Sequence, residues 1–239
     1  MVQGEIRPDK AVDKLFQFDP PDIDYVIVSH AHLDHSGLLP ALVREGYRGP
    51  IFVTTPTYDL LDIMLKDAAF IQKKDIEWEN KRRMRRGKKP VDPIYDIDDV
   101  EQVLKQLITI NYDLKIDITE RLDLCFRDAG HIIGSSIVEL WIKEKGQTKK
   151  LVFSGDLGNS CSPLLRDPEI IEDADILLME STYGDRNHRP AADTIEEFKE
   201  ALNEAMEDQG NVFIPSFAVG RTQDLLYHLG QFYRDGILG

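Results

Sequence analysis

The chain has 239 residues, 42% of them hydrophobic, which is enough for a sizeable folded core. Its 29 basic and 43 acidic residues give a formal net charge of −14, which argues against a protein that coats nucleic acid without sequence preference. No apolar run approaches the length of a bilayer span and the start lacks the features of a signal peptide, so we expect a cytoplasmic protein with no membrane partner.

A short apolar run at 25–28 leads into a loop rich in metal-binding side chains. Residues 30–37 read His-Ala-His-Leu-Asp-His-Ser-Gly and contain half of the chain's six histidines. Residues two apart at a strand end point the same way, so His30 and His32 can hold one ion together. Asp34 and His35 cannot easily join the same set, so two ions are expected.

The chemistry of these ligands indicates the metal. Neutral imidazole and carboxylate groups suit zinc, with manganese or iron as alternatives. The plain alternative is a polar loop with structural histidines.

The elements that follow alternate between helix and strand. The spacing predicts a helix from Leu38 to Val43, a strand at 51–54 and a helix from Thr55 whose apolar face extends to Ile71 and packs on the sheet. Residues 81–89 then place seven positive charges in nine positions. This run fits either attraction to a polyanion or a solvated helix end, and it lacks aromatic residues that would stack on bases.

After a second amphipathic helix, indicated by apolar residues from Val100 to Leu107, the apolar period changes from near four to two. Alternation predicts antiparallel strands, and Lys145-Gly146 is typical of a hairpin turn. The strands are expected at 114–118, 122–126, 137–142 and 151–153.

Two loops among these strands carry further candidates. His131 lies between glycines in residues 128–135, and Asp156 lies between glycines in residues 154–159. Each loop alone is weak evidence for a metal site, because such turns and single histidines are more often structural. In combination with the first loop, His131 would complete the ion site of His30 and His32. Asp156 would bridge to the second ion, with an activated water between the two ions.

The last third of the chain reads as a new α/β unit. A strand at 176–179 ends in Glu180, and Thr194 to Glu197 form a predicted capping box at the start of a helix. A strand at 212–214 and a helix from about Arg221 are expected next.

The motif His-x-His-x-Asp-His, followed by His131 and Asp156, resembles the metallo-β-lactamase fold superfamily. Residues 180–184 and 215–223 resemble its β-CASP branch of RNA-processing nucleases. The resemblance implies an α/β (α+β) fold, a four-layer αββα sandwich with metals at one edge. It implies a metallo-β-lactamase-like domain at 1–190 with its first strands missing, and the truncated start of a β-CASP domain at 191–239.

The resemblance also implies a function, a dinuclear zinc ribonuclease that cleaves RNA phosphodiester bonds with metal-activated water. Asp34 and Glu180 would be catalytic, and Arg221 is a candidate phosphate contact with a surface ion pair as the alternative. The second metal is expected to bind weakly, because a further ligand histidine would lie beyond residue 239. The implied metal ligands are His30, His32, Asp34, His35, His131 and Asp156.

Two other functions and one assembly state follow from the same residues. The chain could hydrolyse a small ester or thioester, or it could be a metal-binding but catalytically silent fragment or scaffold. Missing strands would leave sheet edges open, which predicts a homodimer through those edges.

Overall fold

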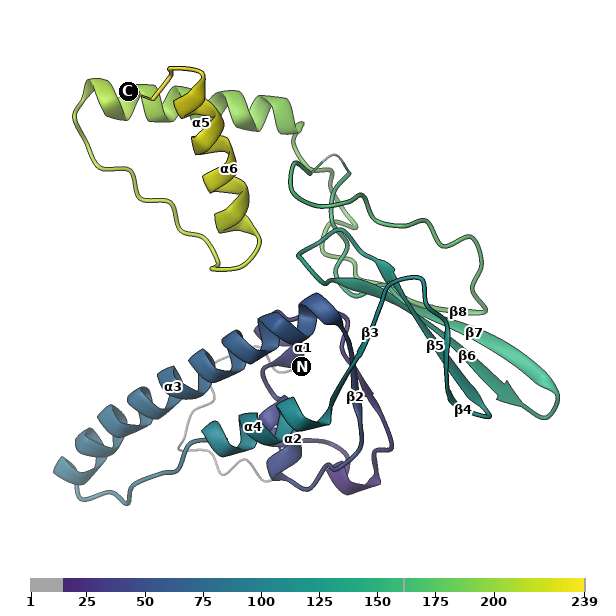
Figure 1. Cartoon of the computed structure of the whole chain (residues 1–239). Coiled ribbons are helices and arrows are strands. Elements are labelled where there is room, and N and C mark those ends of the chain that lie inside the picture. Colours follow the sequence, from purple (N-terminus) through teal and green to yellow (C-terminus); the bar gives the residue numbers. More distant parts are fainter. Residues whose placement is uncertain (1–14, 161, 239) are drawn as a thin grey trace.

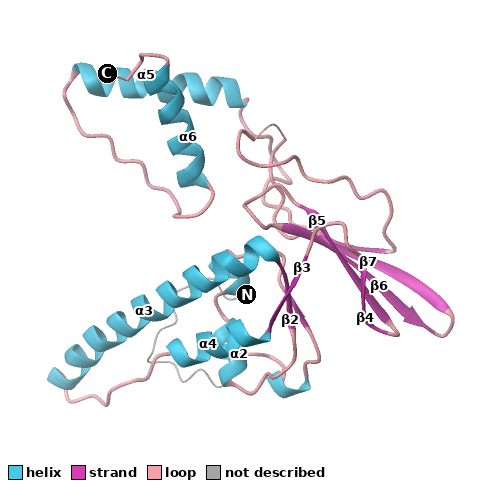
Figure 2. Ribbon diagram, viewed as in Figure 1, coloured by secondary structure: helices cyan, strands magenta, loops and turns pink. Residues whose placement is uncertain are grey.

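The described residues form two β-sheets, and α2, α3 and α4 lie beside the first of them (Figures 1 and 2). The computed structural model describes residues 15–160 and 162–238. The first sheet is parallel, in the order β1-β2-β3, and comprises Val26–Ile27, Ile51–Thr54 and Leu107–Ile110. The second has the order β4-β5-β6-β7-β8 and is antiparallel except for the pair β7 and β8. Its strands are Ile116–Thr119, Leu122–Asp128, Ser136–Glu144, Gln147–Phe153 and Ile176–Leu178.

Most of the helices connect or follow these strands. A short 3-10 helix, η1 (Pro20–Asp22), precedes β1, and α1 (Leu33–Ser36) follows it. The longest helix of the described chain is α3 (Thr55–Arg85), which begins where β2 ends. The other helices of the described chain are α2 (Leu39–Arg44), α4 (Ile97–Gln106), α5 (Ala191–Glu207) and α6 (Arg221–Arg234).

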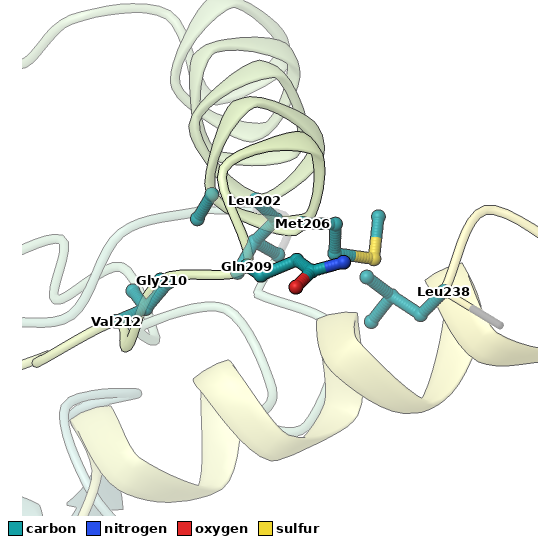
Figure 3. A pocket seen from close by; sticks show the side chains of 7 residues that line it. Leu202, Met206, Gln209, Gly210, Val212 and Leu238 are labelled. Carbon is teal, nitrogen blue, oxygen red and sulfur yellow. The ribbon is translucent and has the colours of Figure 1, made fainter.

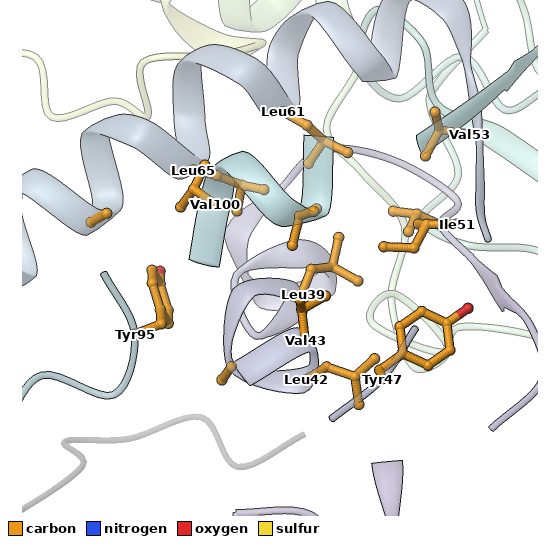
Figure 4. Close-up of a cluster of buried hydrophobic side chains, with 14 of the residues drawn as sticks. Leu39, Leu42, Val43, Tyr47, Ile51, Val53, Leu61, Leu65, Tyr95 and Val100 are labelled. Carbon is orange, nitrogen blue, oxygen red and sulfur yellow. The ribbon is translucent and has the colours of Figure 1, made fainter. Parts of the chain in front are cut away.

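The alternation of side chains along β2 shows how the layers pack. Ile51 and Val53 point to one face and belong to a core cluster with residues of α2, α3 and α4, including Leu61 (Figure 4). Phe52 points to the opposite face and packs with Leu124 and other residues of the second sheet. The first sheet therefore lies between a layer of helices and the second sheet. The α/β fold class expected from the sequence is confirmed.

The outer face of the second sheet carries a smaller apolar cluster. Ala129, Ile137 and Val152 pack there against Leu157 and Ile171, which come from loops. Strand β8 forms one edge of this sheet, and its side chains are about half exposed.

Helices α5 and α6 form a separate pair (Figure 1). The rings of Phe198 and Phe232 lie 5.8 Å apart between them. A pocket at one end of the pair is lined by residues of α5, the following loop and the segment after α6, none of which is a candidate metal ligand (Figure 3). Helix α5 begins at Ala191, but the proposed domain boundary at residue 190 stays a prediction.

Four expectations for single elements were wrong. The helix at 100–107 ends at Gln106, because Leu107 begins β3, which pairs in parallel with β2. The helix α3 continues through most of the basic run, and Ile71 is 50% exposed rather than packed on the sheet.

The other two lie in the last third of the chain. Thr194 does not cap α5, since the helix begins after Pro190 and the Thr194 hydroxyl donates to the Pro190 carbonyl within the helix. Residues 212–214 form no strand, and Phe213 is 89% exposed, because the described chain provides no neighbouring strand for pairing.

Candidate metal centre

Loops from both sheets meet at one edge of the molecule. Strands β5, β7 and β8 end at this edge and β6 begins there, as the pairs Asp128 with Ser136 and Phe153 with Leu178 show. The loop after β1 joins them, because both the amide and the hydroxyl of Ser136 donate to the carbonyl of Ser29, at 2.8 and 2.9 Å. The topology therefore brings the three polar loops found in the sequence together.

Three histidines and one aspartate converge at this edge. His32 Nδ1 lies 3.2 Å from His30 Nε2 and 3.2 Å from His131 Nε2. Asp156 Oδ2 lies 3.8 Å from His30 Nε2 and 3.6 Å from His131 Nε2. One ligand atom from each of these four residues lies within 4.8 Å of all the others, so the group could hold a metal ion.

The spacing of these atoms suits a tetrahedral ion. Ligands at about 2.0–2.1 Å from a tetrahedral zinc ion are separated from one another by about 3.3 Å. Four of the six distances between these atoms, at 3.2 to 3.8 Å, lie close to this value, and all six are within 4.8 Å. The donor set of three imidazole nitrogens and one carboxylate oxygen also fits, because each group can offer a lone pair to a zinc ion.

A second group lies on the other side of Asp156. His35 Nε2 is 3.2 Å from Asp156 Oδ1 and 3.5 Å from Asp34 Oδ2. The two oxygens of Asp156 thus face the two groups separately, one oxygen for each. The structure brings all six candidate ligands together.

The surroundings of His30 and His131 keep these two imidazoles in the form that binds metals. Burial, and then the nearby His35, His32 and His131, lowers the pKa of His30 to about 2. Burial and His32 lower the pKa of His131 as well, although Asp156 and Glu180 act in the opposite direction. Both side chains are therefore neutral at physiological pH and can offer a lone pair.

Glu180 lies behind the Asp156 loop and holds its backbone. Its carboxylate accepts a hydrogen bond from the amide of Leu157 at 2.7 Å, and its own amide donates to Ser154 Oγ at 3.1 Å. Burial raises the pKa of Glu180, but the hydrogen bonds from Leu157 and Thr182 outweigh it, so the pKa is lowered overall. Glu180 therefore sits as a carboxylate that fixes the loop next to Asp156.

Arg221 is an exposed residue at the start of α6. The preceding residue, Gly220, packs against the side chain of Ile132, where an added Cβ would come within 3.0 Å of the Ile132 Cγ2 atom. The N-terminus of α6 therefore lies against the loop that carries His131.

Two glycines set the position of Asp156. Gly155 has a φ of +56°, and a Cβ there would stand 2.9 Å from the Cβ of Ser29. At Gly158 a Cβ would collide with the carbonyl of Gly130 and would stand 2.8 Å from the amide nitrogen of His131. Gly155 therefore allows the Asp156 loop to approach Ser29, and Gly158 allows it to touch the His131 loop.

Sequence reasoning did not single out the serines that tie these loops together. Ser36 donates to the carbonyls of Ala31 and His32, at 2.9 and 3.0 Å, and so holds the turn of the first motif. A serine in a helix commonly donates to the carbonyl four residues earlier, which is the signal that could have identified Ser36.

Comparison with known families agrees with this centre. The profile of the Metallo-beta-lactamase superfamily matches residues 6–106. The chain therefore contains a metallo-beta-lactamase domain, and the superfamily predicted from the motifs is confirmed for these residues.

Individual relatives cover most of this chain. It is 41% identical to the ribonuclease TTHA0252 of Thermus thermophilus over 214 residues, which are 90% of this chain and 44% of that protein. It is 37% identical to the transcription termination factor FttA of Methanocaldococcus jannaschii over 94% of this chain and 34% of that protein. For FttA of Cenarchaeum symbiosum the values are 35% identity, 90% and 31%. The chain thus spans less than half the length of these relatives.

Proposed function

We propose that this chain carries the metal centre of a hydrolase that cleaves RNA phosphodiester bonds. The observation that supports this most strongly is the convergence of His30, His32, His131 and Asp156. The relative with 41% identity is a ribonuclease, which supports RNA as the substrate.

We further propose that the centre holds two zinc ions. The first would be held by His30, His32 and His131, and the second by Asp34 and His35, with Asp156 shared between them. A donor set rich in neutral imidazole favours zinc over manganese or iron. When bound, such a pair supplies an activated water and polarises a phosphoryl oxygen.

The protein's own residues would orient the incoming water, hold the backbone beside Asp156 and bind the phosphate group. The side chain of Asp34 is 43% exposed, so its carboxylate can accept a hydrogen bond from an incoming water and orient it. Glu180 acts as a positioning residue, since its carboxylate holds the Leu157 amide and with it the backbone beside Asp156. Arg221 and the amides at the start of α6 would receive a phosphate group beside the His131 loop.

This location of α6 favours a phosphodiester over a small ester or thioester. A helix N-terminus with an arginine attracts a phosphate anion, whereas a neutral thioester gains little from it. The contact of Gly220 with Ile132 places that N-terminus beside the centre.

One set of measurements tests the proposal. The metal content per chain is determined, and hydrolysis of a 5′-phosphorylated single-stranded RNA is compared with hydrolysis of a thioester, for wild type, His32→Ala and His228→Gln. His228 lies on α6 outside the cluster and serves as the matched control. We expect bound zinc and RNA cleavage in wild type and the control, both lost in His32→Ala.

Other outcomes would contradict the proposal. Thioester hydrolysis without RNA cleavage would indicate a small-substrate hydrolase, and bound zinc with neither activity would indicate a silent metal-binding module.

Within the described residues no helix combines the length and apolarity needed to cross a membrane. The cytoplasmic location and the homodimer stay predictions.

A further inference from the structure

The outward face of α3 combines aromatic and basic side chains. Phe70, Lys74, Trp78, Lys81 and Arg85 follow one another at intervals of three or four residues, which keeps them on one side of the helix. This side lies opposite the buried residues of the same helix. Those buried residues are Thr57, Leu61, Leu65 and Ala69.

The two rings on this face are open to solvent. Phe70 is 60% exposed and Trp78 is 65% exposed. The ammonium group of Lys74 lies 5.7 Å from the ring centroid of Phe70, and the guanidinium of Arg82 lies 5.8 Å from that of Trp78. Such pairs on a helix surface add only about 0.2–0.5 kcal/mol each to its stability, which does not account for leaving two large rings exposed.

The basic end of α3 is residues 81–89, which form the last turn of the helix and the loop after it, and it continues this face. Lys81, Arg85, Arg86 and Lys89 are exposed, and none forms an ion pair within the described chain, whereas Arg82 lies 4.0 Å from Glu79. The whole chain carries a charge of −14, so this end reverses the sign of the charge locally. Its charge is complementary to that of a polyanion.

We propose that the outward face of α3 and its basic end bind single-stranded RNA away from the metal centre. Bases stack on the rings of Trp78 and Phe70, and phosphates contact Lys81, Arg85 and Arg86. Single-stranded nucleic acid is the polymer that offers both charged phosphates and open base faces, and this pairing matches the composition of the surface. The choice of RNA over DNA rests on the proposed function.

The helix also sets the distance between this surface and the metal centre. The hydroxyls of Thr54 and Thr57, at the start of α3, both donate to the carbonyl of Gly134 in the His131 loop, at 2.7 and 2.8 Å. From Thr55 to Trp78 the helix rises by about 35 Å at about 1.5 Å per residue. A single RNA strand that reaches both sites must therefore span about this distance.

The test measures binding separately from cleavage. Chelator-treated protein is titrated against labelled single-stranded RNA of 5 and 20 nucleotides and against a 20-base-pair RNA duplex, with anisotropy as the readout. We compare Trp78→Ala with Tyr233→Ala, an exposed aromatic control on α6, and Arg85→Glu with Lys145→Glu, an exposed charge control in a hairpin.

We expect Trp78→Ala to weaken binding of the 20-nucleotide strand by about 5- to 150-fold, the effect of losing about 1–3 kcal/mol of base stacking. It should leave duplex binding unchanged, because paired bases offer no open faces. Arg85→Glu should weaken binding of both polymers and lower the salt dependence. The two control variants should bind as wild type.

Three results would overturn the inference. These are wild-type affinity of Trp78→Ala for the single strand, equal losses in the Tyr233→Ala control, and conversion of a dimer into a monomer by Trp78→Ala in light scattering. Binding that depends on Trp78 in a protein that cleaves no RNA would uphold this surface and contradict the proposed hydrolase. RNA cleavage by a protein whose RNA binding does not depend on Trp78 would support the proposed hydrolase and contradict this binding surface.

Discussion

Replacing Gly158 by alanine should disturb the metal centre without removing any ligand. The new Cβ would overlap the Gly130 carbonyl oxygen by more than about 1 Å, since real Cβ atoms stay at least 3.0 Å from such a neighbour. Metal ligands keep their distances to within about 0.2 Å, so a shift of this size in either loop separates His131 from Asp156. We expect a loss of metal affinity of about 10- to 100-fold, the range seen when outer-shell partners are removed.

The assay is calorimetric titration of metal-free protein with zinc, accompanied by urea unfolding. Overpacking should also lower the free energy of unfolding by about 1–3 kcal/mol. Gly210→Ala is the matched control, because a Cβ there would find its nearest neighbour at 3.8 Å, an ordinary contact. Wild-type zinc affinity in Gly158→Ala would refute the view that contact between the two loops sets the geometry of the centre.

Four further predictions concern other parts of the molecule. His35→Ala should reduce bound metal from two ions to one in elemental analysis; retention of two would rule out the second group. Leu61→Ala, at a fully buried position, should lower the free energy of unfolding in urea by about 2–5 kcal/mol, and a smaller loss would contradict the observed packing. Because the pKa of Glu180 is lowered overall, its stabilisation is present above the ordinary glutamate pKa and fades as the pH falls through the lowered value. Glu180→Gln should therefore flatten the acid limb of the stability profile, and an unchanged limb would argue against the Leu157 hydrogen bond. If β8 mediates dimerisation, Leu177→Lys should yield monomers in light scattering, and an unchanged dimer would exclude this edge.

The local pattern of apolar residues predicted most of the helices and strands. It failed where pairing with a neighbouring element determined the secondary structure. The spacing of Val100, Val103 and Leu104 correctly predicts a helix. Leu107 extends the same spacing but belongs to β3, because Leu107–Ile110 pairs with β2. Phe213 lies in an apolar run typical of a strand, yet a strand requires a partner, and the partner is not visible in the run itself.

The six candidate ligands could be identified from residue types, because three histidines in six positions are rare outside metal sites. Their grouping depended on sheet topology, which brings residues about a hundred positions apart to one edge. The sequence could not show that Trp78 shares a helix face with Arg85. That requires knowing that α3 continues to Arg85, beyond the apolar pattern that ends near Ile71.

The origin of the ligands in two sheets has a consequence for folding. His30 and His32 follow β1 of the first sheet, whereas His131 and Asp156 belong to loops of the second. The two sheets must dock before one ion can bind tightly to ligands from both. Contacts between residues so distant in sequence form late in folding. Metal binding should therefore slow unfolding more than it speeds refolding. At a free metal concentration a thousand times its dissociation constant, it would stabilise the docked sheets by about 4 kcal/mol.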